Sequence, residues 1–389
     1  MPTCPTYKLG DVAEIILGQS PESKSYNTKG EGLPFFQGKS EFSDWFPVPN
    51  KWCTEPKKIA EPLDILLSVR APVGPTNVAK EKCCIGRGLA AIRYPECYKY
   101  VLYYLRSVSK HLESKATGTT FSSISGDVIR NLPIPLPPLP TQHQIVSRIE
   151  SLFAELDKAE EHLRTAQQQL KIYKQAVLNQ WLNNEDGKWE TMKLGEVAEK
   201  IFDGPFGTHL KSDDYVAAGI RVVRLENIKA GFFDDSKQSF VTEEKYETIK
   251  RHTVYPSDLI MSTFIAEEVK VCQMPEYIGF AVNKADCIGI RLKPEISVDY
   301  IKYYLSLRSV YHELEIQVHG ATRPRVNTTQ IKNIKISLPP LPEQQRIVEE
   351  IEFRLSQAEA AEARIAESLQ KTEALRQSIL KKAFSGELV

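Results

Sequence analysis

The chain has 389 residues, 42% of them hydrophobic and 26% charged, and its 50 Lys and Arg are balanced by 50 Asp and Glu. This composition is typical of a soluble globular protein of two or three domains, and it excludes a disordered chain, a collagen and a small disulfide scaffold. No apolar run reaches the ~18 residues of a membrane helix, and the N-terminus does not resemble a secretory signal. The seven cysteines are scattered without Cys-x-x-Cys spacing, so we expect reduced thiols and a cytoplasmic protein.

Residues 1–140 are predicted to form a mixed α and β domain. Apolar runs of strand length occur at 63–69 and 89–93, and apolar residues at helical spacing follow from Val101 to Leu112. Gly86-Arg87-Gly88 fits the start of a dinucleotide-binding fingerprint. However, a strand-like stretch follows where that fingerprint requires a helix, so we do not expect a nucleotide site there.

A proline-rich tract at 132–140 leads into residues 141–185, which are predicted to be one long helix. No Gly or Pro occurs between 142 and 182, and Thr141 with Gln144 forms a capping box. Two functions are open for the tract: a P-x-x-P ligand, or the stiff connector that we prefer. Apolar residues alternate at spacings of four and three, which indicates a coiled-coil seam; its members are Ile145, Ile149, Leu152, Leu156, Leu163, Leu170 and Val177.

The second half of the chain repeats the first. The offset between matching segments grows from 185 near the N-terminus to 202 at the proline-rich tracts, and then stays constant to the end. Residues 186–340 are therefore predicted to be a second copy of the domain, and 341–389 a second copy of the long helix. The matching pairs include 8–14 with 193–199, 62–68 with 256–262, 103–105 with 303–305, and Leu-Pro-Pro-Leu-Pro at 136–140 and 338–342.

The second helix carries Ile347, Ile351, Ile365, Leu375 and Ile379 at seam positions, with Arg354, Ser368 and Thr372 interrupting the seam. The first helix ends where the second domain begins, and the second helix starts where that domain ends. Because domain termini usually lie close together, the helices are expected to run antiparallel. The alternative is two hairpins, each packed on its own domain. The expected fold is α+β: two α/β domains separated by an antiparallel two-helix coiled coil, duplicated with pseudo-two-fold symmetry.

Catalytic motifs are missing from both copies. There is no phosphate-binding Gly-x-x-x-x-Gly-Lys loop, no His-Glu-x-x-His and no Gly-x-Ser-x-Gly, and the histidines are never paired at metal-ligand spacing. Charge is unevenly distributed: residues 1–140 hold 17 basic and 13 acidic side chains, 186–340 hold 21 and 22, and both helices are acidic. Two duplicated domains without visible chemistry indicate a recognition function.

Basic residues among small polar ones, in segments that we expect to be loops, are the candidates for DNA contacts. Arg, Lys, Asn, Gln, Ser and Thr are the side chains that bond phosphates and base edges. In the first domain the candidates are Gln37, Lys39, Arg70, Arg87, Thr119, Thr120 and Ser122. In the second domain they are Arg221, Arg224, Asn227, Thr322, Arg323, Arg325 and Asn327.

The order of domain, Leu-Pro-Pro-Leu-Pro, long helix, second domain, Leu-Pro-Pro-Leu-Pro-Glu-Gln-Gln-Arg-Ile-Val and second helix resembles the specificity subunit of type I restriction-modification enzymes. The segments 66–74 and 85–93 also resemble that family's target-recognition domains. Their counterparts Met261-Ser262-Thr263 and 287–291 depart from the pattern. The resemblance covers the whole chain.

This resemblance implies a non-catalytic subunit in which each domain reads one half of a bipartite site on double-stranded DNA. The coiled coil would space the halves and dock two modification methyltransferase subunits. S-adenosylmethionine, ATP and Mg²⁺ would be bound by those partners and by restriction/translocase subunits, with no cofactor, metal or membrane contact in this chain. Divergent domains on helices of one length predict an asymmetric target with a fixed spacer. Two alternatives are open: a coiled-coil scaffold with two protein-binding modules, or the recognition part of another methyltransferase system.

Overall fold

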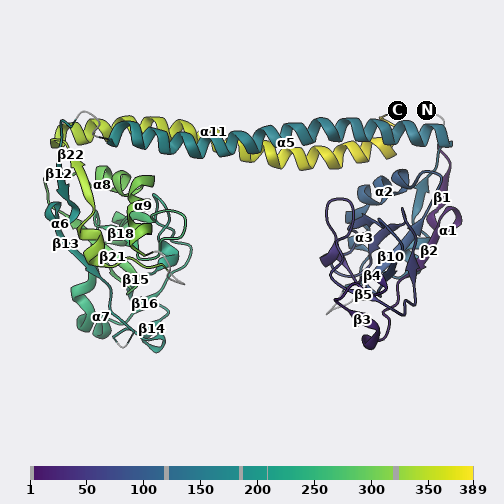
Figure 1. The fold of residues 1–389 in the computed structure, drawn as a ribbon, viewed down its shortest axis with the longest axis horizontal. Helices are drawn as coiled ribbons and strands as arrows, with labels where there is room; N and C mark the ends of the chain where they lie inside the picture. Colours follow the sequence, from purple (N-terminus) through teal and green to yellow (C-terminus); the bar gives the residue numbers. More distant parts are fainter. Residues whose placement is uncertain (1–3, 118–121, 184–186, 208, 319–323, 389) are drawn as a thin grey trace. The chain divides into compact units, whose positions relative to one another are not determined.

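The computed structural model describes residues 4–117, 122–183, 187–207, 209–318 and 324–388. The chain forms two units: unit 1 comprises 1–164 and 366–389, and unit 2 comprises 165–365. Each unit holds one α/β domain together with parts of the two long helices, α5 (Leu139–Leu182) and α11 (Leu341–Phe384) (Figure 1). The boundary between the units therefore crosses both helices.

The domain of unit 1 is built on three sheets, with strand orders β2-β10-β7-β8, β3-β5-β4-β9-β6 and β1-β11. The pair β4 and β9 is parallel, and the other paired strands of unit 1 are antiparallel. The strands are β1 (Thr6–Lys8), β2 (Glu14–Leu17), β3 (Tyr26–Asn27), β4 (Leu33–Phe36), β5 (Trp52–Cys53), β6 (Ile59–Ala60), β7 (Ile65–Ser68), β8 (Thr76–Val78), β9 (Cys83–Ile85), β10 (Leu89–Arg93) and β11 (Pro133–Pro135). The short helices are α1 (Leu9–Val12), α2 (Tyr98–Ser107), α3 (Ser109–Ser114) and α4 (Gly126–Arg130).

Unit 2 repeats these sheets strand for strand, as β13-β21-β18-β19, β14-β16-β15-β20-β17 and β12-β22, which confirms the duplication. Its strands are β12 (Glu190–Lys193), β13 (Ala198–Asp203), β14 (Tyr215–Val216), β15 (Ile220–Val223), β16 (Phe240–Val241), β17 (Thr253–Val254), β18 (Leu259–Ser262), β19 (Val271–Gln273), β20 (Ala281–Asn283), β21 (Cys287–Leu292) and β22 (Lys335–Leu338). Its helices are α6 (Leu194–Val197), α7 (Glu243–Ile249), α8 (Val298–Leu305), α9 (Arg308–Gln317) and α10 (Thr328–Lys332). Helix α7 lies between β16 and β17, where the offset of the repeat increases.

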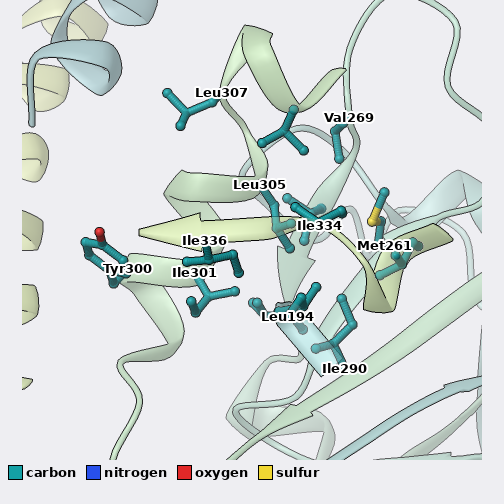
Figure 2. Packing of buried hydrophobic residues seen from close by; sticks show 14 of the residues in the cluster. Leu194, Met261, Val269, Ile290, Tyr300, Ile301, Leu305, Leu307, Ile334 and Ile336 are labelled. Atoms are coloured by element: carbon teal, nitrogen blue, oxygen red, sulfur yellow. The ribbon is translucent and has the colours of Figure 1, made fainter. Parts of the chain in front are cut away.

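The hydrophobic core of each unit extends from its domain into the long helices. In unit 1, Ile149 of α5 and Leu380 of α11 belong to the same buried cluster as the strands β7 and β10. In unit 2, Val177 of α5 and Ile351 of α11 belong to the corresponding cluster, part of which Figure 2 shows. Each domain is thus fixed to the helix ends nearest to it by apolar burial.

Two buried tyrosines attach the domain helices to the strands that lead into the long helices. The Tyr100 hydroxyl on α2 donates to the Pro135 carbonyl on β11 at 2.6 Å. Its repeat partner Tyr300 on α8 donates to the Ser337 carbonyl on β22 at 2.6 Å. The proline-rich tract of the first copy therefore begins as a strand inside the domain.

The long helices run in opposite directions along one another. In unit 2, Lys174 of α5 pairs with Glu362 of α11 at 2.6 Å. In unit 1, Arg376 of α11 pairs with Asp157 and, at 3.6 Å, with Glu160 of α5. Partners further along α5 are thus found earlier on α11, which confirms the antiparallel direction.

The expected seam members that are buried belong to the hydrophobic clusters of the two domains. Of the expected members, Ile145, Ile149, Val177, Ile347 and Ile351 are buried, while Leu152, Leu156, Leu163, Leu170, Ile365 and Ile379 are half-buried. The expectation for Leu375 is wrong, because this side chain is 50% exposed and Thr372, expected to interrupt the seam, is buried. The Thr372 hydroxyl donates to the Ser368 carbonyl at 3.0 Å, which satisfies it inside the helix pair.

Two expected boundaries also shift. Helix α5 begins at Leu139, so Thr141 lies inside the first turn and is not the cap. Instead, the buried Gln142 amide donates to the Pro137 carbonyl at 2.9 Å, as Gln344 does to Pro339 at 2.8 Å. The helix expected from Val101 to Leu112 is interrupted at Val108, which separates α2 from α3.

Candidate nucleic-acid interface

Four loops of unit 1 are joined by backbone hydrogen bonds into what we call the loop frame: residues 36–39, 69–71, 86–88 and 122–124. The turn between β9 and β10 is central, because it bonds to the end of β4 on one side and to the loop after β7 on the other. The bonds run from Gly86 N to Phe36 O (2.8 Å), from Val69 N to Gly88 O (2.9 Å), from Ile124 N to Val69 O (3.0 Å) and from Ala71 N to Ser122 O (2.9 Å).

Unit 2 forms the same frame, bond for bond, from residues 223–227, 263–265, 284–286 and 324–326. The corresponding bonds run from Lys284 N to Val223 O (3.0 Å), from Thr263 N to Asp286 O (3.0 Å), from Val326 N to Thr263 O (2.8 Å) and from Ile265 N to Pro324 O (3.4 Å). Backbone geometry is therefore common to the two copies, and any difference in recognition has to come from the side chains.

A glycine at the end of the first sheet strand lets the frame close in each copy. A Cβ on Gly18 would lie 2.1 Å from the Gly86 carbonyl oxygen, and one on Gly204 would lie 2.2 Å from the Lys284 carbonyl carbon. Real Cβ contacts are never this short, so no other residue fits without moving the turn.

The frame of unit 1 presents free cations. Lys39, Arg70 and Arg87 are exposed. Within the described part of the chain, none of the three side chains has a hydrogen-bond or ion-pair partner. Gln37 is exposed beside them and Ser122 is half-buried. Thr119 and Thr120 lie outside the described residues.

The frame of unit 2 places its cations elsewhere. Arg70 of unit 1 forms a β-bridge with Ser123, and the repeat equivalent of that bridge joins Phe264 to Arg325. The two copies therefore carry their arginine on opposite members of this bridge. Arg224, half-buried, replaces Gln37 and contacts Ser239 and the ring of Tyr215. The two frames share a backbone but differ in where positive charge is presented.

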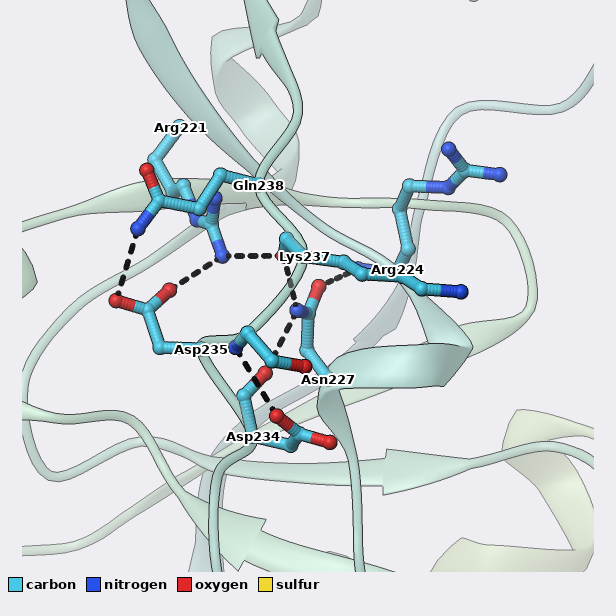
Figure 3. Close-up of polar contacts among 8 residues, drawn as sticks. Arg221, Arg224, Asn227, Asp234, Asp235, Lys237 and Gln238 are labelled. Carbon is cyan, nitrogen blue, oxygen red and sulfur yellow. Dashed lines mark hydrogen bonds and ion pairs between the residues drawn. The ribbon is translucent and has the colours of Figure 1, made fainter. Parts of the chain in front are cut away.

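Arg221 and Asn227 are buried, so the expectation that they lie on exposed loops is wrong. Figure 3 shows the polar contacts that they make with the 234–237 loop. Arg221 is on β15, 7% exposed, and pairs with Asp235 at 2.6 Å. Asn227 is 1% exposed, accepts from Arg224 N at 2.9 Å and donates to the Asp234 and Lys237 carbonyls at 2.9 and 2.8 Å. Both side chains hold the 234–237 loop in place.

Asn327 is exposed, but it caps α10 by accepting from Gln330 N at 3.0 Å. Its repeat equivalent Ser125 caps α4, so this position serves helix formation in both copies. Thr322 and Arg323 lie outside the described residues.

Sequence reasoning missed Asp286 and Lys284, which lie in the central turn of the second frame. They occupy the places of Gly88 and Gly86 in the first copy. An alignment of the two copies through Ile92-Arg93 and Ile290-Arg291 would have found them, since the offset of 198 applies to the whole turn.

A second surface is duplicated as well: a groove between each domain and the long helices. The groove of unit 1 has a volume of about 350 Å³ and that of unit 2 about 440 Å³. In unit 1 it is lined by Gly74, Arg106, Phe153, Glu373, Arg376 and Gln377 among others. The repeat equivalents of all of these except Glu373 line the groove of unit 2, namely Glu268, Ser306, Leu355, Lys174 and Gln175.

The two grooves differ in charge. Among the lining residues, unit 1 has Arg106 and Arg376 with Glu373. Unit 2 has two lysines and three carboxylates, namely Lys174, Lys302, Glu268, Glu352 and Glu359. A common partner would thus meet one mildly basic and one mildly acidic surface.

All seven cysteines are free thiols, six of them buried. Burial raises the pKa of Cys83, Cys84 and Cys272 to about 12, so these thiols are unreactive at neutral pH. Within the described ranges no helix is long and apolar enough to cross a membrane, and no group of three His, Cys, Asp or Glu is arranged to hold a metal ion.

The fold and the loop frames define a class of protein with two recognition domains of one plan, carried on paired antiparallel helices. The family model described as Type I restriction modification DNA specificity domain matches residues 3–165 and 186–370. The chain belongs to this family and is the DNA specificity subunit, a non-catalytic part, of a type I restriction-modification system.

Two relatives illustrate the range of similarity. A putative MjaX specificity subunit of Methanocaldococcus jannaschii is 40% identical, over 43% of this chain and only 39% of the relative's own length. The EcoBI specificity subunit of Escherichia coli is 23% identical, over 98% of this chain and 85% of the relative.

Solved structures support the same fold. A chain from a structural study of complex assembly and conformational transition in a type I restriction-modification system is 20% identical, with a TM-score of 0.76 over 100% of this chain and 99% of that one. The HsdS subunit of Thermoanaerobacter tengcongensis is 20% identical, with a TM-score of 0.58 over 100% of this chain and 98% of that one.

Proposed function

We propose that each domain reads one half of a bipartite, asymmetric site on double-stranded DNA through its loop frame. The observation that carries the proposal is the pair of frames that share their backbone hydrogen bonds but differ in side chains. A common backbone gives the two domains the same way of docking, while unlike side chains select unlike base sequences. Residues 1–140 and 186–340 are the two target-recognition domains in this scheme.

Within the first domain, Arg70, Arg87 and Lys39 are the proposed phosphate contacts, because they are exposed and carry unpaired charge. Gln37 and Ser122 belong to the same frame and are the proposed contacts to base edges or sugars. In the second domain Arg224 and Arg325 are the proposed DNA contacts. Arg221 and Asn227 hold the 234–237 loop and Asn327 caps α10, so these three are not proposed as DNA contacts.

Residues 141–185 and 341–389 are proposed to set the distance between the half-sites. Deleting one matched heptad from both α5 and α11 shortens a helix by ~10 Å, which corresponds to about 3 base pairs. The spacer of the methylated sequence should shorten accordingly, and an unchanged spacer would refute a measuring role for the helices.

The duplicated grooves support docking of two methyltransferase subunits, one on each copy. Both grooves combine helix and domain surface, so a partner bound there would be held against the domain that reads DNA. S-adenosylmethionine would be bound by these subunits, and ATP and Mg²⁺ by restriction/translocase subunits, in the cytoplasm where the DNA is. This chain would contribute recognition alone.

Binding of the assembled methyltransferase complex to its target DNA at increasing salt tests the proposal. If the frames contact phosphates, log K falls linearly with log salt, by ~0.9 per phosphate neutralised. We further expect the isolated subunit, with a net charge of zero, to bind DNA weakly. A complex whose slope is unaffected by any substitution in the frames would indicate a protein-binding scaffold instead.

A further inference from the structure

Arg325 is held in a fixed direction at the rim of the second frame. Its Nη2 atom pairs with Asp286 Oδ1 at 3.1 Å, and its guanidinium lies 4.2 Å from the centre of the Phe264 ring. The Arg325 side chain is nevertheless 52% exposed and that of Asp286 27%. Arg325 Nε and Nη1 and Asp286 Oδ2 have no hydrogen-bond partner among the residues that the structure describes.

The duplication shows that this ion pair is not needed to build the frame. In unit 1 the equivalent positions hold Ser123 and Gly88, which cannot form an ion pair, and yet the same backbone bonds are made. The other arginine–aspartate pairs of unit 2 differ in burial: Asp258 is 4% exposed in its pair with Arg291, and Arg221 is 7% exposed in its pair with Asp235. Those pairs hold elements together, whereas Arg325 and Asp286 face outward.

We infer that Arg325 and Asp286 together read one G·C base pair in the half-site of the second domain; this inference rests on the proposed function. Asp286 takes up one Nη2 hydrogen of Arg325, so the second Nη2 hydrogen is left to form a two-donor edge with Nη1 or with Nε. Such an edge matches the N7 and O6 acceptors of guanine, and the free carboxylate oxygen of Asp286 matches the N4 amino donor of cytosine. No other base pair offers two acceptors and a neighbouring amino donor in this arrangement. Stacking on Phe264 reduces the freedom that Arg325 would lose on binding.

A carboxylate beside DNA repels phosphates, which argues against a phosphate contact for this pair. Arg325 with Asp286 has no net charge, so it adds nothing to non-specific attraction. Arg70 in the first frame has no such partner and keeps its full charge. The cations of the two frames therefore have different functions. In the second domain Arg325, oriented by Asp286, selects a base pair, and in the first domain the unpaired cations contact the DNA phosphates.

The test uses the complete complex with its methyltransferase subunits and maps the methylated sequence in cells. For Asp286→Ala and Arg325→Ala we expect one G·C position in one half of the sequence to become degenerate, with discrimination reduced by about 10- to 100-fold. The other half-site and the spacer should be unchanged. Glu247→Ala, which removes an exposed ion pair with Lys250 on the same domain, is the matched control and should leave the sequence unchanged.

Exchanging the two charges, Asp286→Arg with Arg325→Asp, separates reading from structure. If the pair only stabilises the loop, the exchange restores the original sequence, which would overturn the inference. If the pair reads the base pair, the position stays degenerate or changes its preference. The inference is also overturned if Asp286→Ala and Arg325→Ala lower the methylation level without changing the sequence.

Failure of the proposed function would look different. Replacing Arg224, Lys284 and Arg325 together by alanine would then leave both halves of the methylated sequence intact. Loss of a single position under Asp286→Ala, together with loss of a whole half-site under the triple substitution, supports both statements.

Discussion

Arg93 donates two hydrogen bonds to Asp64, from Nε at 2.9 Å and from Nη2 at 2.8 Å, and joins β10 to the turn that precedes β7. Its repeat equivalent Arg291 donates to Asp258 at 2.9 and 2.6 Å. Each aspartate also caps its turn, accepting from Glu61 N or Tyr255 N at 2.8 and 2.9 Å. In each domain this ion pair therefore connects one strand of the sheet to the turn that precedes the neighbouring strand.

Asp64→Ala should destabilise the first domain by about 3 kcal/mol, because it removes the buried partner of a partly buried guanidinium. Glu14 also contacts Arg93, but its side chain is 60% exposed, so Glu14→Ala should cost less than about 1 kcal/mol. Urea unfolding of the two variants measures the difference. Equal midpoints for both would show that the buried pair contributes no more than a surface contact.

Arg70→Ala should weaken DNA binding by the assembled complex without changing the methylated sequence. The plot of log K against log salt should become shallower by about 0.9, the contribution of one phosphate contact. Arg70→Lys keeps the charge and should restore most of the slope. Lys158→Ala, an exposed lysine on α5, is the control. A changed sequence with an unchanged slope would assign Arg70 to base reading instead.

His252 should make the second domain less stable at acid pH. The side chain is 7% exposed. Its Nδ1 lies 2.6 Å from the Asp203 carbonyl, and its Nε2 accepts from Arg251 Nε at 2.9 Å, an arrangement that requires neutral imidazole. Burial, with Arg251 adding to it, lowers the His252 pKa, so the unfolded chain binds more protons than the folded one below pH ~6.5.

Stability contributed by neutral His252 is therefore present above pH ~6.5 and is lost as the pH falls toward the lowered pKa. Thermal unfolding between pH 7.5 and 5 should show this loss, and His252→Gln should reduce it. If the thermal stability of His252→Gln depends on pH as that of the original protein does, the titrating group is not His252.

A tryptophan in either groove should block one methyltransferase subunit. Ser356→Trp fills the groove of unit 2 and Gln377→Trp that of unit 1; both residues are exposed on α11. Their neighbours Gln357 and Ser378 are also exposed and do not line the grooves, so Gln357→Trp and Ser378→Trp are matched controls. Native mass spectrometry should detect one bound subunit with each groove variant and two with each control. If two methyltransferase subunits bind to all four variants, docking takes place on another surface.

The sequence predicted the architecture because the repeat and the heptads are long signals. Duplication, helix direction and the strands at β7 and β10 follow from offsets and periodicity. The buried ends of the seam, such as Ile149 and Val177, were also predictable. The predicted seam was wrong at Leu375 and Thr372. Residues Leu380 and Ala383 of α11 belong to the domain core, and this core determines which face of α11 is buried. A heptad count takes no account of the domain.

Individual site residues were harder to predict, because exposure depends on where a strand begins. Arg221 is in strand β15 and pairs with Asp235. The β-branched residues around it, Ile220, Val222 and Val223, are typical of a strand, but they do not show that the Arg221 side chain is buried. Asp286 was overlooked because it carries the charge opposite to the one expected at a DNA surface. Arg70 and Arg325 lie where loops were expected, since glycine and proline mark those turns in both copies.

Two unlike domains that read two unlike half-sites would produce a methylated sequence with two different halves. Mapping of methylated bases across the genome of cells that carry the complete system tests this most directly. We predict a methylated sequence of two different half-sites separated by a non-specific spacer of fixed length, in which exchanging residues 186–340 for those of a relative alters one half alone. A continuous palindrome, or a change in both halves after that exchange, would contradict the account.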